Sequence, residues 1–413
     1  MSPSQTNNFK TSLAAIKRRR PTFGRGGSGD IAGELLELLN ELKDSPVSAE
    51  EGVKSVASLY EADHAIFDKH DDSSGSIGYA FKVAAAEVFS YFAAQCADKK
   101  SVIKLVFKLN KTDDYGVRDS LFAGMASYLS EAEIKLAVEQ LWTLSHASES
   151  QRDSDEFHYD NWLQAIKTIA KQTSNPQLYA DACRRPDGEP LGIAASIELA
   201  RVFFASGNPL EALNSLAHLP IEESFMEDER DELLIEIYRK LANDEMLVET
   251  LWRVFRRERC PAVFESLLQK LGPENKERLV DEETSLIFAE ADYKGTSTAF
   301  LIDMGRLLDA ERYVIAKFRT INGGFYSSLL PLAESMLSHK LHVGASLIYR
   351  ALLDSILHRA KAANYHHGAK YLKKLDKLAL KITDWKGVDG HDLYLEQLRK
   401  KHRLKSRFWQ LYG

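Results

Sequence analysis

The chain has 413 residues, a formal net charge of −6, and 44% hydrophobic and 28% charged residues. This length exceeds what one ordinary core serves, so we expect two domains or one elongated array. The composition is that of a folded globular protein rather than a disordered one. No run of about 18 apolar residues occurs, and residues 1–11 lack an apolar signal-peptide region, so we expect a cytoplasmic protein without a membrane partner.

The three cysteines, Cys96, Cys183 and Cys260, lie far apart and form no CxxC pair. This spacing argues against a cysteine-based zinc site and against a disulfide framework. We therefore expect each cysteine to be a reduced packing residue.

Residues 1–29 are predicted to form a basic arm followed by a glycine-rich linker. The segment carries six Lys or Arg residues and no acid before Asp30. Within it, Leu13 and Ile16 lie at helical spacing and predict a short amphipathic helix over residues 9–19. Residues 21–29 (PTFGRGGSG) have the composition of a linker.

From Asp30 onward, apolar residues at helical spacing predict helices to the end of the chain. Ser48 with Glu51, and Ser130 with Glu133, have the spacing of capping boxes at helix starts. Residues 77–96 are rich in Ala and Phe and predict one buried helix. Further helices are predicted over residues 162–170, 193–205, 233–241, 247–255, 279–291 and 345–356.

The best strand candidate is residues 102–109, but Ser101 could cap a helix there and the apolar spacing also fits one. No window shows clean alternation of apolar and polar residues. Residues 112–116 read as a turn. We therefore predict an all-α fold.

Two windows, residues 203–219 and 336–352, share a finer pattern: a large residue, a tight turn, then a small residue where two helices touch. Ala212 and Ala345 are the predicted contact points, and the turn glycine of the first window is lost in the second. These degenerate copies predict an irregular, right-handed α-solenoid of tetratricopeptide-like helix pairs. We expect three parts: the arm at 1–29, an N-terminal helical array at 30–185, and a C-terminal array with a basic end at 186–413.

Several stretches resemble a bacterial family of unknown function, helical and tetratricopeptide-like, that is related to helical segments of some SWIM zinc-finger proteins. They are HDDSSG at 70–75, DDYGV at 113–117, LIYRAL at 347–352, Tyr371-Leu372, Trp385, and a pattern from His391 through Tyr394, Leu398, Arg399, His402 and Lys405 to Phe408-Trp409. The resemblance covers roughly residue 30 to the C-terminus. It implies a helical fold and no activity, and because the CxC and CxH metal motif is absent, no zinc function transfers.

Motifs of common enzymes are missing. The glycines at 24–29 precede no Lys-Ser/Thr pair, and neither GxSxG nor HExxH occurs. His391-Asp392 resembles part of a phosphohydrolase metal motif, but no later aspartate follows. Asp71 begins a calcium-like loop whose twelfth position is Lys82 instead of glutamate, so we interpret this loop as an Asx-type turn that ends a helix. Residues 113–116 are interpreted as an N-capping turn before Val117.

Seven histidines fall in the last 75 residues, which makes a metal cluster conceivable. No two of them show the i, i+4 spacing that places two imidazoles on one helix face, so we expect them to lie among basic residues or to cap helix C-termini. They are His339, His342, His358, His366, His367, His391 and His402. We predict no catalytic residue, cofactor or metal ligand, and keep a metal-dependent enzyme as a third hypothesis.

Charge is spread very unevenly. Residues 1–27 carry a charge of +6, residues 28–338 carry −22, and residues 339–413 carry +10. In the last segment, five lysines lie at helical spacing opposite an apolar face that comprises Ala369, Leu372, Leu375, Leu378 and Ile382. Phe408, Trp409 and Leu411 are predicted to pack as a terminal cap.

Two interpretations of the basic residues stay open. They could form a solvated face or one that docks on the protein's own acidic middle, for example residues 222–236; or they could bind phosphate backbones. Our leading hypothesis is a non-enzymatic scaffold that binds a protein or peptide partner, with the acidic middle favouring a basic one. The alternative is a nucleic-acid-binding protein that uses Arg18, Arg19, Arg20, Arg25, Lys370, Lys373, Lys374, Lys377, Lys381, Arg399, Lys400 and Arg403.

Overall fold

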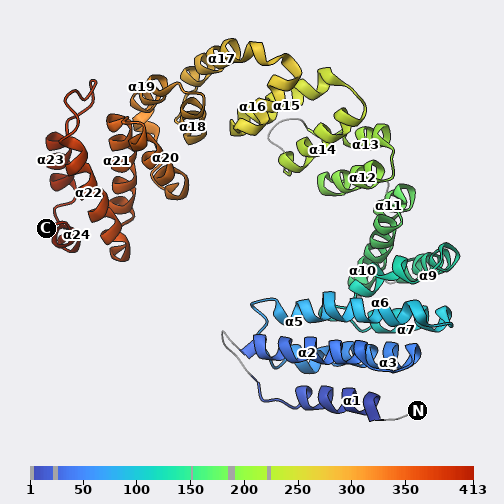
Figure 1. Ribbon diagram of the computed structural model, residues 1–413. Coiled ribbons are helices and arrows are strands. Elements are labelled where there is room, and N and C mark those ends of the chain that lie inside the picture. Colours follow the sequence, from blue (N-terminus) through green and yellow to red (C-terminus); the bar gives the residue numbers. More distant parts are fainter. Residues whose placement is uncertain (1–3, 22–26, 150–151, 185–190, 221–224) are drawn as a thin grey trace. The chain divides into compact units, whose positions relative to one another are not determined.

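The computed structural model describes residues 4–21, 27–149, 152–184, 191–220 and 225–413 (Figure 1). Within these ranges the regular elements are helices and no strand occurs, which confirms the predicted all-α class. None of the helices in these ranges is long and apolar enough to cross a bilayer. The chain divides into two compact units, residues 1–230 and 231–413. The expected three-part division stays a prediction.

The first unit contains thirteen α-helices within its described residues, together with the start of α14. They are α1 (Ser4–Lys17), α2 (Gly27–Asp44), α3 (Ala49–Tyr60), α4 (Asp63–Phe67), α5 (Ser76–Tyr79), α6 (Ala86–Gln95), α7 (Lys99–Asn110), α8 (Ser120–Ala123), α9 (Glu131–Glu149), α10 (Arg152–Gln172), α11 (Pro176–Cys183), α12 (Ile193–Ala205) and α13 (Pro209–Leu216). A π-helix (Ala80–Ala85) joins α5 to α6, and a short 3-10 helix (Met125–Ser127) follows α8. One buried apolar cluster runs through this unit from Phe9 to Ala182.

The predicted amphipathic helix is confirmed as α1. Phe9, Leu13 and Ile16 are buried, and α1 packs against α2, α3 and α4. The predicted linker is too long, because α2 already begins at Gly27; residues 22–26 lie outside the described part. The basic N-terminal segment is therefore anchored to the core of its unit by an apolar helix face.

Of the three helix caps predicted from the sequence, two are confirmed and one is wrong. Both capping boxes form: Ser48 Oγ accepts the Glu51 amide at 3.2 Å, and the Ser130 amide donates to Glu133 at 2.8 Å. Residues 102–109 are helical, as expected, but Asp98 caps α7 in place of Ser101. Asp98 accepts the Ser101 amide at 3.1 Å, so Ser101 is the residue that the cap holds.

The predicted helix over residues 77–96 is confirmed, with a π-helical stretch in its middle. A π turn widens the ladder and leaves a backbone carbonyl without its usual helical donor. The hydroxyl of the fully buried Tyr60 donates to the Phe81 carbonyl at 2.9 Å, which satisfies such a group. Burial raises the pKa of Tyr60, so this hydroxyl keeps its proton.

The helices that lie mainly or wholly in the second unit run from α14 to α24. They are α14 (Glu227–Lys240), α15 (Asp244–Glu258), α16 (Pro261–Leu271), α17 (Lys276–Ala289), α18 (Gly295–Asp303), α19 (Leu307–Lys317), α20 (Tyr326–Ser338), α21 (His342–Arg359), α22 (Tyr365–Ala379), α23 (His391–Lys401) and α24 (Ser406–Tyr412), with 3-10 turns at Pro273–Asn275, Phe318–Thr320 and Ala362–Asn364. Helix α21 packs against α19, α20 and α22, and most of its residues are buried (Figure 1). It is the central helix of the C-terminal part.

In the described part of the chain, one turn recurs between five pairs of successive helices. In each, a residue with positive φ ends the first helix, and the next amide donates to the carbonyl five residues earlier at 2.7–3.0 Å, as in a Schellman motif. The positive-φ residues are Ser174, Gly207, Ala242, Gly305 and Lys340. The two predicted windows contain two of these turns, and Ala212 and Ala345 are fully buried. Lys340 takes the left-handed conformation (φ 62°) where the glycine is lost.

Two sequence expectations about packing need correction. Phe408 is fully buried and α24 packs on α22, but Leu411 is 42% exposed and is no part of a cap. Cys96 is buried, whereas Cys260 is exposed at the start of α16 and is no packing residue.

Candidate functional site

A hollow of about 660 Å³ lies beside α21 in the second unit. Its wall is built from α21, from the segment that follows α19, from residues 387–389 ahead of α23, and from α23 itself. Three cationic side chains line it, Arg319, Arg350 and Lys401, and two acidic ones, Asp354 and Asp389. His358 also lines this hollow.

Arg350 is the most unusual residue of this hollow. It is only 7% exposed, and its guanidinium carbon lies 4.7 Å from the ring centre of Trp385 and 4.5 Å from that of Tyr394. Nη1 donates to the Asp389 carbonyl at 2.8 Å. Nε and Nη2 are buried and have no hydrogen-bond partner among the described residues. Burial lowers the pKa of Arg350, but a guanidinium still keeps its charge at neutral pH.

Asp354 lies one helical turn after Arg350 and also faces the hollow. Tyr394 donates to Asp354 Oδ1 at 3.0 Å. Burial raises the pKa of Asp354 above its ordinary value, against the opposing effects of the Tyr394 hydrogen bond and of Lys401 and Arg350. Burial also raises the pKa of Tyr394, so its hydroxyl stays a donor. Arg350 thus contacts two aromatic rings and donates to one backbone carbonyl, and Tyr394 links it to Asp354.

A second hollow, of about 380 Å³, adjoins the first because Gly323 and Ser355 line both. Its wall is largely apolar and includes Tyr326, Leu330, Leu352, Ile356 and Tyr371. A Cβ atom on Gly323 would lie 1.9 Å from the Ala351 carbonyl oxygen, so only glycine lets this segment lie so close to α21. Tyr326, which lines this hollow, is 66% exposed.

The residues that carry the family resemblance separate into two groups in the structure. Arg350, Trp385 and Tyr394 meet in the stack described above. His391 instead approaches Asp376 at 2.8 Å, and Asp376 also accepts from the Tyr412 hydroxyl. Among the described residues, no three or more His, Cys, Asp or Glu side chains are grouped so that they could hold a metal ion.

The two acidic turns of the first unit bind backbone amides. Asp71 accepts the Ser73 amide at 3.0 Å, which confirms the predicted Asx-type turn, and its neighbour Asp72 caps the helix that follows, which was not predicted. Asp72 accepts the amides of Ile77 and Gly78, each at 2.8 Å. Asp113 accepts the amide of Val117 at 3.3 Å and that of Arg118 at 2.8 Å. Both carboxylates are therefore engaged by backbone donors at the start of helical turns.

The predicted basic residues that the structure describes are mostly exposed, and they are divided between the two compact units. Lys370, Lys373 and Lys377 are exposed on α22, as are Arg399 and Lys400 on α23 and Arg403 after it; Arg18, Arg19 and Arg20 are exposed in the first unit, and Arg25 lies outside the described residues. Lys374 is half-buried and pairs with Glu334. Lys381 lies beyond the end of α22 at Ala379, which is earlier than the stripe predicts. Arg19 pairs with Glu34.

Part of this basic set meets aromatic side chains at the C-terminal end. Arg399, Arg403, Trp409 and Tyr412 line a hollow of about 400 Å³. The guanidinium carbon of Arg399 lies 5.7 Å from the ring centre of Trp409. This is a cation beside an aromatic face, the combination that the sequence suggested for binding anions.

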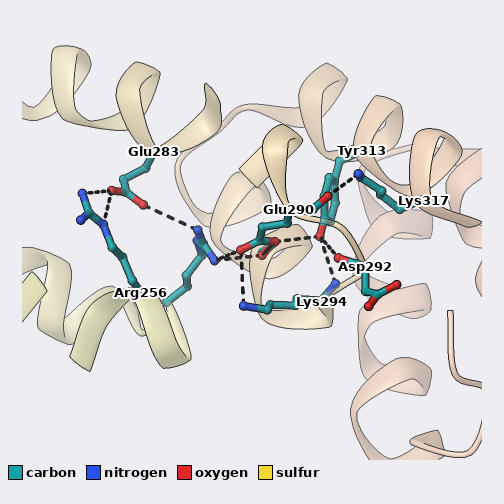
Figure 2. Close-up of polar contacts among 9 residues, drawn as sticks. Arg256, Glu283, Glu290, Asp292, Lys294, Tyr313 and Lys317 are labelled. Carbon is teal, nitrogen blue, oxygen red and sulfur yellow. Dashed lines mark hydrogen bonds and ion pairs between the residues drawn. The ribbon is translucent and has the colours of Figure 1, made fainter. Parts of the chain in front are cut away.

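A network of ion pairs and hydrogen bonds connects three helices of the second unit (Figure 2). No sequence pattern predicted this network. Arg256 donates to Glu283 at 2.9 Å, and the buried Arg259 lies 3.7 Å from Glu283 and donates to Glu290 at 2.7 Å. Tyr313 donates to Glu290 at 3.0 Å. Burial and the Glu290 charge raise the pKa of Tyr313 to about 12. Because the charges in this network are paired with one another, we interpret the network as structural: it holds α15, α17 and α19 together.

Residues 2–411 match the model of a family described as "Family of unknown function (DUF6880)", and the chain belongs to that family. No curated protein matches the chain.

Proposed function

We propose, taking this family membership as the premise, that the protein is a non-enzymatic interaction scaffold that binds a protein or peptide partner on a helical-repeat surface. The five turns with the same hydrogen-bond pattern support this proposal, because repeated helix pairs that stack on their neighbours make extended binding surfaces. In this proposal the pairs form an irregular, right-handed, tetratricopeptide-like α-solenoid. The relation to SWIM zinc-finger proteins stays a prediction.

The observation that carries the proposal is the pair of adjoining hollows beside α21. They combine the exposed aromatic side chain of Tyr326, a largely apolar wall and a charged wall. Ligand sites typically pair a mainly apolar lining with a few placed polar groups. An extended peptide rises about 3.3 Å per residue, so a short segment would cross both hollows.

Selection of a displayed random peptide library on the immobilised full-length protein tests the proposal, with peptides of about 12 residues, enough to cross both hollows. We expect an enriched motif whose affinity falls about tenfold or more in Tyr326→Ala, since buried aromatic contacts dominate such interfaces. Leu308→Ala is the matched control, because Leu308 is 73% exposed but does not line either hollow. No enriched motif, or equal losses in both variants, would count against the scaffold.

The second candidate function is nucleic-acid binding at the C-terminal end. It is supported by the exposed lysines of α22 and by Arg399 and Arg403 beside Trp409. Exposed cations with an aromatic platform suit a phosphate backbone and a stacked base.

Fluorescence anisotropy of labelled DNA and RNA at about 50 and 200 mM salt tests this candidate. Binding should fall steeply with salt and should weaken in a Lys370→Glu, Lys377→Glu variant. The control variant is Lys100→Glu, Lys104→Glu, which changes two exposed lysines of α7. Absence of binding at the lower salt concentration would exclude the candidate.

A further inference from the structure

We propose that the two adjoining hollows beside α21 bind a carboxylate next to an apolar side chain, with Arg350 as the carboxylate-binding residue. This inference rests on the proposed scaffold function and names the chemistry of the partner segment that the scaffold would hold.

The free edge of Arg350 supports the carboxylate. Nε and Nη2 lie on the same edge of the planar guanidinium, and together they match the two oxygens of a carboxylate in a bidentate pair. Both atoms are buried and have no hydrogen-bond partner among the described residues, and the Arg350 side chain lines the hollow. Because neither atom is exposed, a carboxylate reaches this edge as the side chains that cover it move aside. Buried donors of this kind are costly unless a partner satisfies them. The opposite edge is used, because Nη1 donates to the Asp389 carbonyl.

The stack explains why this arginine suits binding. The guanidinium lies against the rings of Trp385 and Tyr394, and these two contacts restrict its orientation. A side chain that is already ordered loses little conformational freedom when it binds. The same rings shield the charge from water, which strengthens a charge-assisted hydrogen bond.

The charge of the wall favours a carboxylate over a phosphate. Arg319, Arg350 and Lys401 oppose Asp354 and Asp389, so the ionised wall without His358 carries a net charge of +1. A carboxylate carries a single negative charge and balances this wall. A phosphate group carries close to two near neutral pH and would be repelled by the two acids.

The neighbouring hollow sets the second half of the ligand. It shares Gly323 and Ser355 with the first, and its wall includes Leu330, Leu352 and Ile356. An aliphatic side chain of the size of leucine, next to the carboxylate in the ligand, would be buried against these residues in the second hollow. The ligand class is therefore a peptide segment with an acidic group beside an aliphatic residue.

Three probes of matched size test the inference on full-length protein. Acetyl-glutamyl-leucinamide carries a side-chain carboxylate, acetyl-glutaminyl-leucine a terminal one, and acetyl-glutaminyl-leucinamide none. Inorganic phosphate is the fourth ligand. Binding is followed by the arginine Nε–H NMR signals of protein labelled with ¹⁵N-arginine, and the Arg350 signal is identified by its loss in Arg350→Lys.

We expect a saturable shift of the Arg350 signal with one or both carboxylates, and which one responds identifies the source of the group. The neutral probe should have no effect on that signal. By a readout independent of the NMR signal, such as calorimetry, Arg350→Lys should weaken carboxylate binding about tenfold or more, because lysine lacks the planar fork. Arg312→Lys is the control, since Arg312 is 70% exposed on α19 and lines neither hollow.

Lys401→Gln provides a second variant if Arg350→Lys melts early. Lys401 is exposed in the wall, so its loss should weaken carboxylate binding a few-fold with the fold intact. No shift of the Arg350 signal up to about 10 mM carboxylate would overturn the inference, as would equal binding of the neutral probe or tighter binding of phosphate. The peptide-library selection tests the scaffold function separately. Any enriched motif supports the scaffold, whether or not that motif contains an acidic residue.

Discussion

The buried ion pair between Asp63 and Arg118 dominates the polar core of the first unit. Both side chains are at most 3% exposed, and two nitrogens of Arg118 donate to the two carboxylate oxygens at 2.8 and 3.0 Å. We expect Asp63→Asn to lower the free energy of unfolding by about 3–5 kcal/mol, because it leaves a buried charge without its partner. Chemical denaturation measures this.

The control for Asp63→Asn is Lys108→Ala. Lys108 pairs with Glu61 at 3.1 Å, but the two side chains are 72% and 50% exposed. Its loss should change the free energy of unfolding by less than about 1 kcal/mol. Equal effects of the two substitutions would contradict the assignment of Arg118 as a buried charge that depends on Asp63.

Asp354 makes stability depend on pH. Its folded pKa lies above the ordinary 3.8, chiefly through burial, so the folded protein holds this proton more tightly than the unfolded chain. Stability from this group is complete below the ordinary pKa and is lost as pH rises through the folded pKa. In Asp354→Asn this loss should be absent, although Arg350, Tyr394 and Lys401 remain beside it. Thermal melts of both proteins from about pH 4 to 8 check this, and parallel curves would contradict it.

Residues that act locally could be predicted from the sequence, and residues that act at a distance could not. Asp71 forms the Asx turn and Asp113 the N-capping turn that their positions predict, so composition and spacing were sufficient. The Arg350 stack uses Trp385 and Tyr394, which follow 35 and 44 positions later in the chain. The family resemblance contained all three residues, but only packing brings them together. The charge map also considers residues only by their order in the chain, so it suggested a basic partner, whereas the packing around Arg350 led us to propose an acidic one.

At the scale of the element, α21 is capped by a residue of another helix. Glu311 on α19 is 4% exposed, and its Oε1 accepts the amides of Val343 and Gly344 at 3.0 and 3.1 Å. Lys386 pairs with its other oxygen. We expect Glu311→Gln to lower the free energy of unfolding by about 1–3 kcal/mol, because the amide loses the negative charge at the helix N-terminus and leaves Lys386 unpaired.

Denaturation of Glu311→Gln should be compared with that of Glu282→Gln. Glu282 is 55% exposed and pairs with Arg278 on its own helix, a contact worth about 0.5 kcal/mol or less. If the two variants were equally stable, Glu311 would not be acting as the cap of α21.

The recurring turn offers a test of backbone strain. Lys340 has φ 62°, and a non-glycine residue in this conformation costs about 1–2 kcal/mol. Lys340→Gly should therefore raise the free energy of unfolding by about 0.5–1 kcal/mol, after the added freedom of the unfolded chain is subtracted. Gly207→Ala should lower it by a similar amount, since a Cβ there meets nothing within 4 Å and only the backbone matters. Shifts of the same sign in both variants would exclude this explanation.

The five turns also show what a pattern search misses at this scale. Only two of the five turns have glycine at the positive-φ position, Gly207 and Gly305. In the other three, Ser174, Ala242 and Lys340 adopt the same left-handed conformation. The periodicity of the helices survives such changes because the buried faces specify it. A turn is specified by three or four residues, so one substitution removes its signal while the hydrogen bonds that hold it remain.

At the scale of the whole molecule, the two compact units should respond independently to local damage. The buried cluster from Phe9 to Ala182 belongs to the first unit, and Asp63 lies in that unit, whereas Glu311 lies in the second. In helical arrays, stability is the sum of local terms and contacts between neighbours, so a lesion spreads only a short way. We expect Asp63→Asn to speed amide hydrogen exchange in α3, α4 and α7, and Glu311→Gln to speed it in α19 to α22. Exchange measured by mass spectrometry on the full chain resolves these segments. Uniform acceleration along all 413 residues in either variant would instead mean that the chain unfolds as one cooperative body, and the description as an array of helix pairs would fail.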